Sequence, residues 1–167
     1  MKRGNTDLNF LIAINKPTGM TSHDVVNRIR TITGEGRVGH MGTLDPCAEG
    51  VMLIGIGSAA RLNNYLELSD KTYIVKITLG KSTNTFDLEG EVTQVFDVDL
   101  KFLTEDFAHN FLDDFVGVHS QKPPAFSAIK VEGKPAYKNA REGKDVELPE
   151  RQIEVYSAKL INIEQNS

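Results

Sequence analysis

The stretch Gly39-His40-Met41-Gly42-Thr43-Leu44-Asp45-Pro46 decides how this chain can fold around a reactive group. Pro46 disfavours helical backbone for Asp45 and holds that residue extended. Gly39 and Gly42 permit positive φ or a close backbone approach. The stretch therefore predicts a stiff loop between a helix and a strand, a sensible way to aim a carboxylate as nucleophile or general base. From the residues alone, an ordinary Asp-Pro turn is the more common interpretation.

The segments on either side predict an α+β domain around a mixed, mostly antiparallel sheet with flanking helices. Thr21 with Asp24 three residues later predicts the start of a helix, and Gly34 predicts its end. A later helix, over 104–116, is expected to bury a stripe of phenylalanines. Strands are expected over 8–14, 51–57, 72–79, 90–96 (paired with 72–79), 126–131 and 153–163, and further helices over 58–68 and 135–142.

Composition places the chain among globular proteins of a reducing compartment. It has 167 residues, 40% of them hydrophobic, which is enough for one ordinary domain with a core. No apolar run is long enough to cross a bilayer and the N-terminus lacks a signal-peptide core, so we expect a cytoplasmic protein without a membrane partner. The single cysteine, Cys47, excludes an internal disulfide and a cysteine-built zinc site. We expect it to be a small buried hydrophobe.

The charge of the chain is unevenly distributed. A net charge of −4 argues mildly against nucleic acid as a partner. Residues 120–144, however, carry six Lys and Arg against two acids, and residues 1–40 carry six against three. The two segments would form one RNA-facing side if the fold brought them together. Ordinary solvated surface charge explains the same pattern equally well.

Four motifs of the sequence resemble those of the TruB/dyskerin family of pseudouridine synthases, in the same order and with the same spacing. Together they cover nearly all of the chain. Residues 37–46 with 48–52 resemble the family's catalytic motif, and residues 15–22 resemble its N-terminal Lys-Pro-x-Gly-x-[Ser/Thr]-Ser element. Residues 70–73 with 79–90 resemble the tyrosine-bearing strand and the turn after it. The family's next motif is matched by residues 123–130 with Gly133, Tyr137, Ala140, Arg141 and Gly143.

The resemblance implies an RNA-modifying isomerase that converts uridine to pseudouridine in the T-loop of tRNA without a metal, nucleotide or redox cofactor. Asp45 would be the catalytic carboxylate. His40 would help to hold the flipped-out nucleotide, and Tyr73 would stack on the uracil and is a candidate for removing the C5 proton. Lys16 and Arg37 would be cations near the carboxylate or the RNA backbone. Each of these residues also has a purely structural alternative. His40 would be a loop histidine that satisfies backbone groups, Tyr73 a core tyrosine, and the two cations ordinary solvated side chains.

The resemblance further implies a monomer that grips the T-arm of tRNA. The sequence stops before the family's Lys-Gly-[Thr/Ser]-Tyr-Ile-Arg strand and its PUA-type RNA-binding domain, so 1–167 is expected to be the N-terminal part of a catalytic domain. An RNA-binding fold without activity is the main alternative, and a hydrolase that uses Asp45 with His40 is a remoter one. The residues expected to clasp RNA are Lys130, Lys134, Lys138, Arg141 and Lys144.

Overall fold

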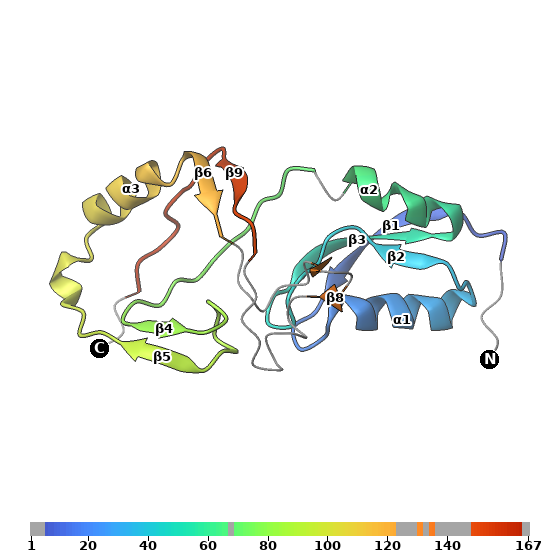
Figure 1. Ribbon diagram of the computed structural model, residues 1–167, viewed down its shortest axis with the longest axis horizontal. Coiled ribbons are helices and arrows are strands. Elements are labelled where there is room, and N and C mark those ends of the chain that lie inside the picture. Colours follow the sequence, from blue (N-terminus) through green and yellow to red (C-terminus); the bar gives the residue numbers. More distant parts are fainter. Residues whose placement is uncertain (1–5, 67–68, 123–129, 132–133, 136–147, 165–167) are drawn as a thin grey trace. The chain divides into compact units, whose positions relative to one another are not determined.

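The computed structural model describes residues 6–66, 69–122, 130–131, 134–135 and 148–164. The chain divides into two compact units, unit 1 (residues 1–76) and unit 2 (residues 77–167), shown in Figure 1. Both units combine helices with strands, and every strand pair in the described part of the chain is antiparallel. This confirms the predicted α+β class.

Unit 1 is built on three antiparallel strands, which cross the sheet in the order β1 (Phe10–Lys16), β3 (Gly50–Ile56) and β2 (Val38–His40). The central strand β3 is apolar on both faces, and Ile54 and Ile56 are fully buried. A strand covered on both faces needs such a continuous apolar run. The two strands predicted before and after the Asp-Pro stretch are confirmed, whereas β2 was not expected.

Helix α1 (Ser22–Thr33) begins and ends where the sequence predicts. The Asp24 N–H donates to the Thr21 hydroxyl at 3.1 Å, and the Thr21 N–H donates to the Asp24 carboxylate at 3.0 Å, which completes a capping box. Gly34 ends the helix in the left-handed conformation, with φ of 71°. The helix packs its apolar face on the sheet. The buried core of unit 1 consists of Val25, Val26, Val38, Met52, Ile54 and Ile56.

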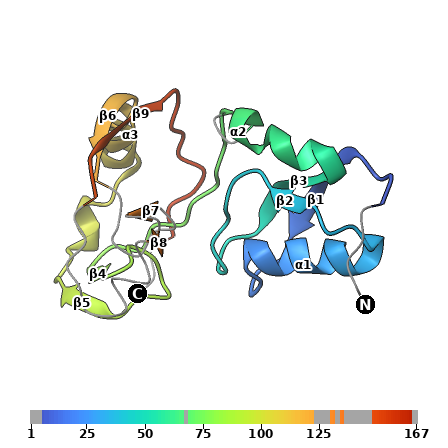
Figure 2. The same cartoon turned by 45° about the vertical axis from the view of Figure 1, so that its right-hand side comes forward.

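The other face of this sheet is covered by η1 (Gly57–Leu62) and the short helix α2 (Asn63–Leu66), as Figure 2 shows. Gly39 and Gly55 lie opposite one another in neighbouring strands and leave a spot without side chains there. A Cβ atom on Gly55 would lie only 2.7 Å from the Cα atom of Ala60. The backbone of η1 therefore rests directly on the backbone of the sheet. The helix predicted here is confirmed in position, although its first turns are 3₁₀.

Unit 2 contains β4 (Lys81–Thr83), β5 (Val92–Val95), η2 (Leu100–Phe102), α3 (Glu105–Asp114), β6 (Gly117–Gln121), β7 (Lys130–Val131), β8 (Lys134–Pro135) and β9 (Arg151–Val155). The strand pairs are β4 with β5, β6 with β9 and β7 with β8. Helix α3 confirms the helix predicted from its acidic first turn, whereas β6 was not expected. The strand predicted over 153–163 forms only at its start. Most of the helix predicted over 135–142 and most of the strand over 126–131 lie outside the described residues, and Pro135 belongs to β8.

The prediction of a strand over 72–79 was wrong. Tyr73 and Val75 keep 61% and 69% of their surface exposed, and none of the described strands pairs with this segment. Alternating residues form a strand only where a neighbouring strand takes up its hydrogen bonds and packs on one face. The strand that was expected to pair with it, β5, pairs with β4 instead, with Ser82 opposite Gln94.

The phenylalanine stripe of α3 is also more exposed than predicted. Phe107, Phe111 and Phe115 keep 51%, 50% and 50% of their surface accessible. The rings of Phe111 and Phe115 pack on each other, with their centroids 5.8 Å apart. Helical spacing predicts which face of a helix is apolar, but not that another element will cover it.

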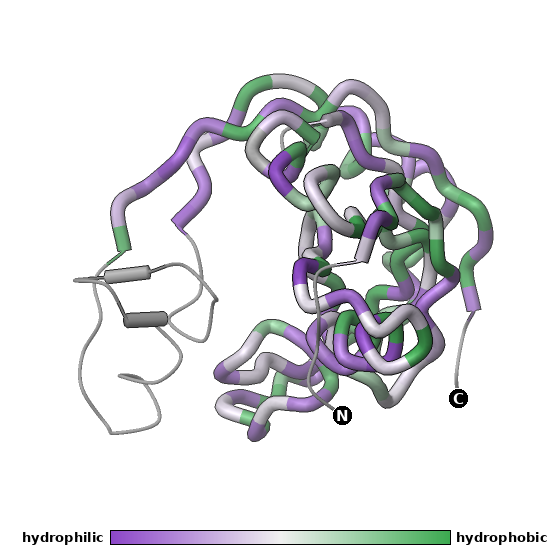
Figure 3. Tube along the Cα trace, turned by 90° about the vertical axis from the view of Figure 1, so that its right-hand side faces the viewer, coloured by the Kyte–Doolittle hydropathy of each residue, from purple (hydrophilic) through white to green (hydrophobic). Residues whose placement is uncertain are grey.

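The described trace carries short hydrophobic stretches that alternate with hydrophilic ones (Figure 3). Helix α1, with 12 residues, is well short of the roughly 20 residues that a membrane-spanning helix needs. Among the described residues, no helix combines the length and the apolarity to cross a bilayer.

Candidate active site

Asp45 lies, with its side chain exposed, on the loop that joins β2 to β3. The sequence suggested a loop between a helix and a strand, but β2 pairs with β3 and turns the segment into a strand connection. The loop leaves β2 with the Met41 N–H donating to the Leu53 carbonyl at 2.9 Å. Gly42 then takes a φ of 106°, which confirms the positive φ that the sequence allowed there.

Both chain neighbours of Asp45 are tied to the start of α1: Leu44 to its first residue and Pro46 to the turn before it. The Ser22 hydroxyl accepts from the Leu44 N–H and donates to the Leu44 carbonyl, each at 2.9 Å. On the other side, the Gly19 N–H donates to the Pro46 carbonyl at 2.8 Å. The carboxylate therefore stands on backbone that is held before and after it, as the stiff-loop prediction requires.

A pocket of about 270 Å³ opens beside this loop, within unit 1. Loop residues up to Leu44 line it, and the exposed Asp45 follows directly in the chain. Tyr73 lines the pocket as well, so the two segments that carry the predicted nucleophile and the predicted aromatic residue meet there. The volume lies just below the range of about 300–1,000 Å³ that is usual for ligand pockets. The lining residues are Met41, Gly42, Thr43, Leu44, Val51, Met52, Leu53, Leu66, Ser69, Asp70, Lys71, Thr72 and Tyr73.

His40, the last residue of β2, is oriented by its own loop. Its Nδ1 lies 2.7 Å from the Gly42 carbonyl oxygen. Since a carbonyl can only accept, Nδ1 carries the proton, and Nε2 is the acceptor of the neutral ring. The contact agrees with the structural alternative, a histidine that satisfies local backbone. It also leaves the ring in one defined orientation next to the pocket-lining loop.

Lys16, at the end of β1, is fully buried. Its ammonium group donates to the Pro17 carbonyl at 3.0 Å and to the Met20 carbonyl at 2.7 Å. A buried ammonium group needs such acceptors, because desolvation without them is costly. The structure gives Lys16 a part in shaping the turn before α1, and its expected place near the RNA backbone stays a prediction.

Arg37 lies beside a buried carboxylate that sequence reasoning missed. Glu35 accepts from the Arg37 N–H at 2.8 Å, from the Thr6 N–H at 2.7 Å and from the Thr6 hydroxyl at 2.8 Å. The backbone hydrogen bond from Arg37, followed by those from Thr6, lowers the pKa of Glu35 from 4.5 to about 2. The Arg37 Nε atom lies 4.0 Å from Glu35. No sequence motif predicts this group of hydrogen bonds, because two of the three come from Thr6, which lies 29 positions away.

The predicted RNA-clasping residues lie mostly outside the described residues. Lys130 and Lys134 belong to the backbone hairpin of β7 and β8, in which Val131 pairs with Lys134. Lys138, Arg141 and Lys144 fall in the part that the structure does not describe. Their role stays a prediction.

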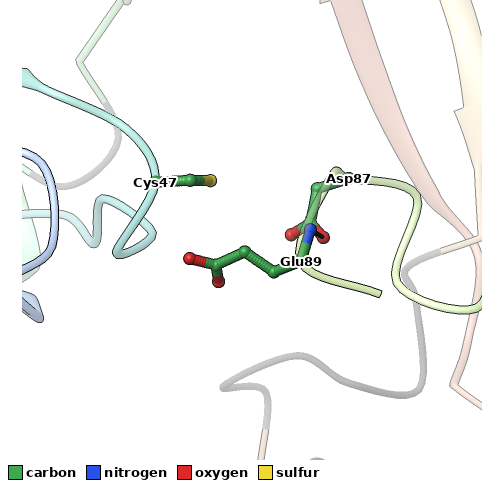
Figure 4. Close-up of side chains that lie close together, drawn as sticks. All are labelled: Cys47, Asp87 and Glu89. Atoms are coloured by element: carbon green, nitrogen blue, oxygen red, sulfur yellow. Dashed lines mark hydrogen bonds between the residues drawn. The ribbon is translucent and has the colours of Figure 1, made fainter. Parts of the chain in front are cut away.

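Figure 4 shows Cys47 on the loop after Asp45, and Asp87 with Glu89 on the turn that follows β4 in unit 2. Cys47 is exposed, so its predicted burial was wrong; Leu44, not Cys47, packs against the core. Within unit 2, the Asp87 carboxylate accepts from the Thr85 hydroxyl at 2.6 Å and from the Glu89 N–H at 3.0 Å. These local hydrogen bonds hold the turn together.

Unit 1 is thus an α+β unit that presents a carboxylate beside a pocket, on a loop held by hydrogen bonds on both sides. The model of the TruB family pseudouridylate synthase (N terminal domain) matches residues 30–167. A tRNA pseudouridine synthase B of Prochlorococcus marinus is 50% identical over 155 residues, covering 93% of this chain and 48% of the relative. One of Clostridioides difficile is 44% identical over 161 residues, covering 95% of this chain and 53% of the relative.

Among solved structures, a chain of a Cbf5-Nop10-Gar1 complex superimposes with a TM-score of 0.56 and 26% identity, covering 92% of this chain and 36% of that one. These similarities agree with the four motifs of the sequence. The chain belongs to the TruB family of pseudouridylate synthases. It spans about half the length of the curated relatives it matches.

Proposed function

We propose that this chain carries the catalytic aspartate of a tRNA pseudouridine synthase, which converts uridine to pseudouridine in the T-loop of tRNA. One observation supports this most directly. Asp45 is exposed on a loop held on both sides, next to a pocket that Tyr73 lines, in a chain 44–50% identical to proteins named tRNA pseudouridine synthase B. A rigid mount for the reacting group is what such a reaction needs.

In the proposed reaction the Asp45 carboxylate attacks the target nucleotide, and the N1–C1′ glycosidic bond of uridine breaks. The base turns within the pocket, and a bond forms between C5 and C1′. The bond between Asp45 and the nucleotide breaks, so the carboxylate is regenerated. The C5 proton leaves and N1 gains a proton, so the product is an isomer of the substrate and no electrons are exchanged. The steps need no metal, nucleotide or redox cofactor. Tyr73 is the candidate for taking up the C5 proton and for stacking on the uracil.

A base inside folded RNA must leave its stack before it can enter a pocket. We assign His40 to holding the extruded nucleotide, with Nε2 as the acceptor that its contact to Gly42 leaves available. Arg37, whose side chain is 51% exposed, is the candidate for a contact to the RNA backbone. The basic segment 120–144 would grip the T-arm. The protein would act in the cytoplasm as a monomer.

The test is the release of tritium from C5-labelled uridine in a T-arm RNA. Asp45→Asn keeps the shape of the side chain and removes its charge, so turnover should fall by a factor on the order of 10³ or more while the unfolding midpoint stays the same. Glu49→Gln is the matched control, because it removes one exposed negative charge from the same loop. It should keep turnover within about twofold.

The same pair of variants should be made at the aligned positions of the Prochlorococcus marinus relative, which is about twice as long. Loss of turnover with Asp45→Asn but not with Glu49→Gln supports the proposal. RNA binding without any turnover by the unsubstituted chain would favour the alternative of a binding fold. Measurable and equal turnover of Asp45→Asn and the unsubstituted chain would refute the role of Asp45.

A further inference from the structure

Ser22 makes a reciprocal contact with the loop that carries Asp45. Its hydroxyl accepts a hydrogen bond from the Leu44 N–H and donates one to the Leu44 carbonyl, both at 2.9 Å. A hydroxyl has one proton and two lone pairs, so it can do both at once. Ser22 is only 3% exposed, so water does not compete readily for this pair. The contact joins residues that are 22 positions apart in the sequence.

The turn before α1 holds the far side of the loop as well. The Gly19 N–H donates to the Pro46 carbonyl at 2.8 Å, and the Asp45 carbonyl accepts from the Ala48 N–H at 3.1 Å. Each of the three consecutive residues 44–46 therefore has at least one backbone group in a hydrogen bond. These hydrogen bonds hold the backbone that carries the exposed Asp45 side chain.

Ser22 holds the loop without being needed to start α1. The N-cap of the helix is Thr21, whose hydroxyl and N–H are both engaged with the Asp24 carboxylate. The Ser22 hydroxyl is directed to Leu44 instead, so removing it deletes no cap. This separates a role in positioning the loop from a role in forming the helix.

We infer that Ser22 is a positioning residue for Asp45: its hydroxyl clamps both backbone groups of Leu44 and thereby sets the direction of the carboxylate. The inference rests on the proposed function for its kinetic consequence, but the clamp itself is independent of it. Misplacement of a reacting group by about 1 Å can cost on the order of 10² in rate. Ser22 touches no substrate atom in this view and acts through Leu44.

Hydrogen exchange of backbone amides tests the clamp in the whole chain. In Ser22→Ala, the Leu44 amide should exchange about tenfold faster, since the variant removes its acceptor. The amides of Ile54, Gly55 and Ile56 in the central strand β3 report global unfolding in the same sample and should not change. Thr31→Ala is the matched control, because it removes an exposed hydroxyl that bonds only within α1, to the Asn27 carbonyl. It should leave the Leu44 amide unchanged.

Tritium release from T-arm RNA tests the consequence. With Ser22→Ala, kcat should fall by about 10- to 100-fold, with KM within about twofold, since binding surfaces are untouched and only the aim of Asp45 changes. An unchanged Leu44 exchange rate, or an equal acceleration at Leu44 and in β3, would overturn the clamp. A faster Leu44 amide with unchanged kcat would overturn the positioning role. Absence of turnover by the unsubstituted chain would favour the alternative of a binding fold, and the exchange rates then decide on the clamp alone.

Discussion

At the scale of single residues, the buried Glu35 shows how one carboxylate joins separate segments. It is fully buried and accepts three hydrogen bonds, two from Thr6 and one from the Arg37 N–H. Such donors favour the charged form, and they lower the pKa of Glu35 from 4.5 to about 2. The residue thus fixes the chain ahead of β1 to the turn before β2.

Glu35→Gln is predicted to lower the free energy of unfolding at neutral pH. The substitution replaces one carboxylate oxygen by an NH2 group, which cannot accept hydrogen bonds from the N–H and O–H donors around it. The folded pKa is depressed, so the stabilisation is complete above about pH 4.5 and is lost as the pH falls towards 2. Urea unfolding of both proteins between pH 7 and pH 2 checks this. The two stabilities should converge across that window. A constant difference down to pH 2 would contradict it.

At the scale of elements, the contact between η1 and the sheet depends on Gly55. A Cβ atom there would lie 2.7 Å from the Ala60 Cα atom and 2.8 Å from the Ala59 carbonyl oxygen. Because these are backbone atoms, they cannot move aside, and Gly55→Ala should destabilise the protein by about 1–3 kcal/mol. Gly39→Ala is the control, since a Cβ atom there meets only the Ala60 Cβ at 3.8 Å. Urea unfolding of both variants checks this, and equal costs would contradict it.

The elements also show where sequence reasoning succeeds. Helix α1 was predicted to within a residue at either end, because Thr21, Asp24 and Gly34 encode its limits locally. The pairing of β5 was predicted wrongly, because alternation identifies a strand but not its partner. For the candidate site, Asp45, His40 and Tyr73 were predicted from motifs. Ser22 and Glu35 stand out only through contacts across 22 and 29 positions of sequence.

At the scale of the whole molecule, the proposed RNA binding would require an acidic chain to concentrate its positive charge. Residues 120–144 carry six Lys and Arg against two acids. Reversing two of them, Lys134→Glu with Lys138→Glu, should weaken binding to T-arm RNA and reduce the slope of log K against log salt by about 2, one for each lost phosphate contact. Titration of labelled RNA at several salt concentrations measures both quantities.

The control reverses two lysines elsewhere, Lys101→Glu with Lys159→Glu, and so makes the same change in net charge. Both lysines are exposed, and Lys101 lies in the acidic stretch 85–114. A smaller loss of affinity in this control supports a local clasp. An equal loss of affinity in the two double variants would mean that RNA binding depends only on the net charge of the protein.

By itself, the sequence determined the family, the limits of α1 and the extended Asp45-Pro46 step, since each depends on motifs whose residues lie a few positions apart. The tertiary structure alone decided that Lys16 and Glu35 are buried, that Ser22 holds Leu44 and that β5 pairs with β4. The physical reason is the range of the interactions. Caps, turns and proline restrictions act between near neighbours, whereas burial and strand pairing depend on which distant segments meet when the chain closes.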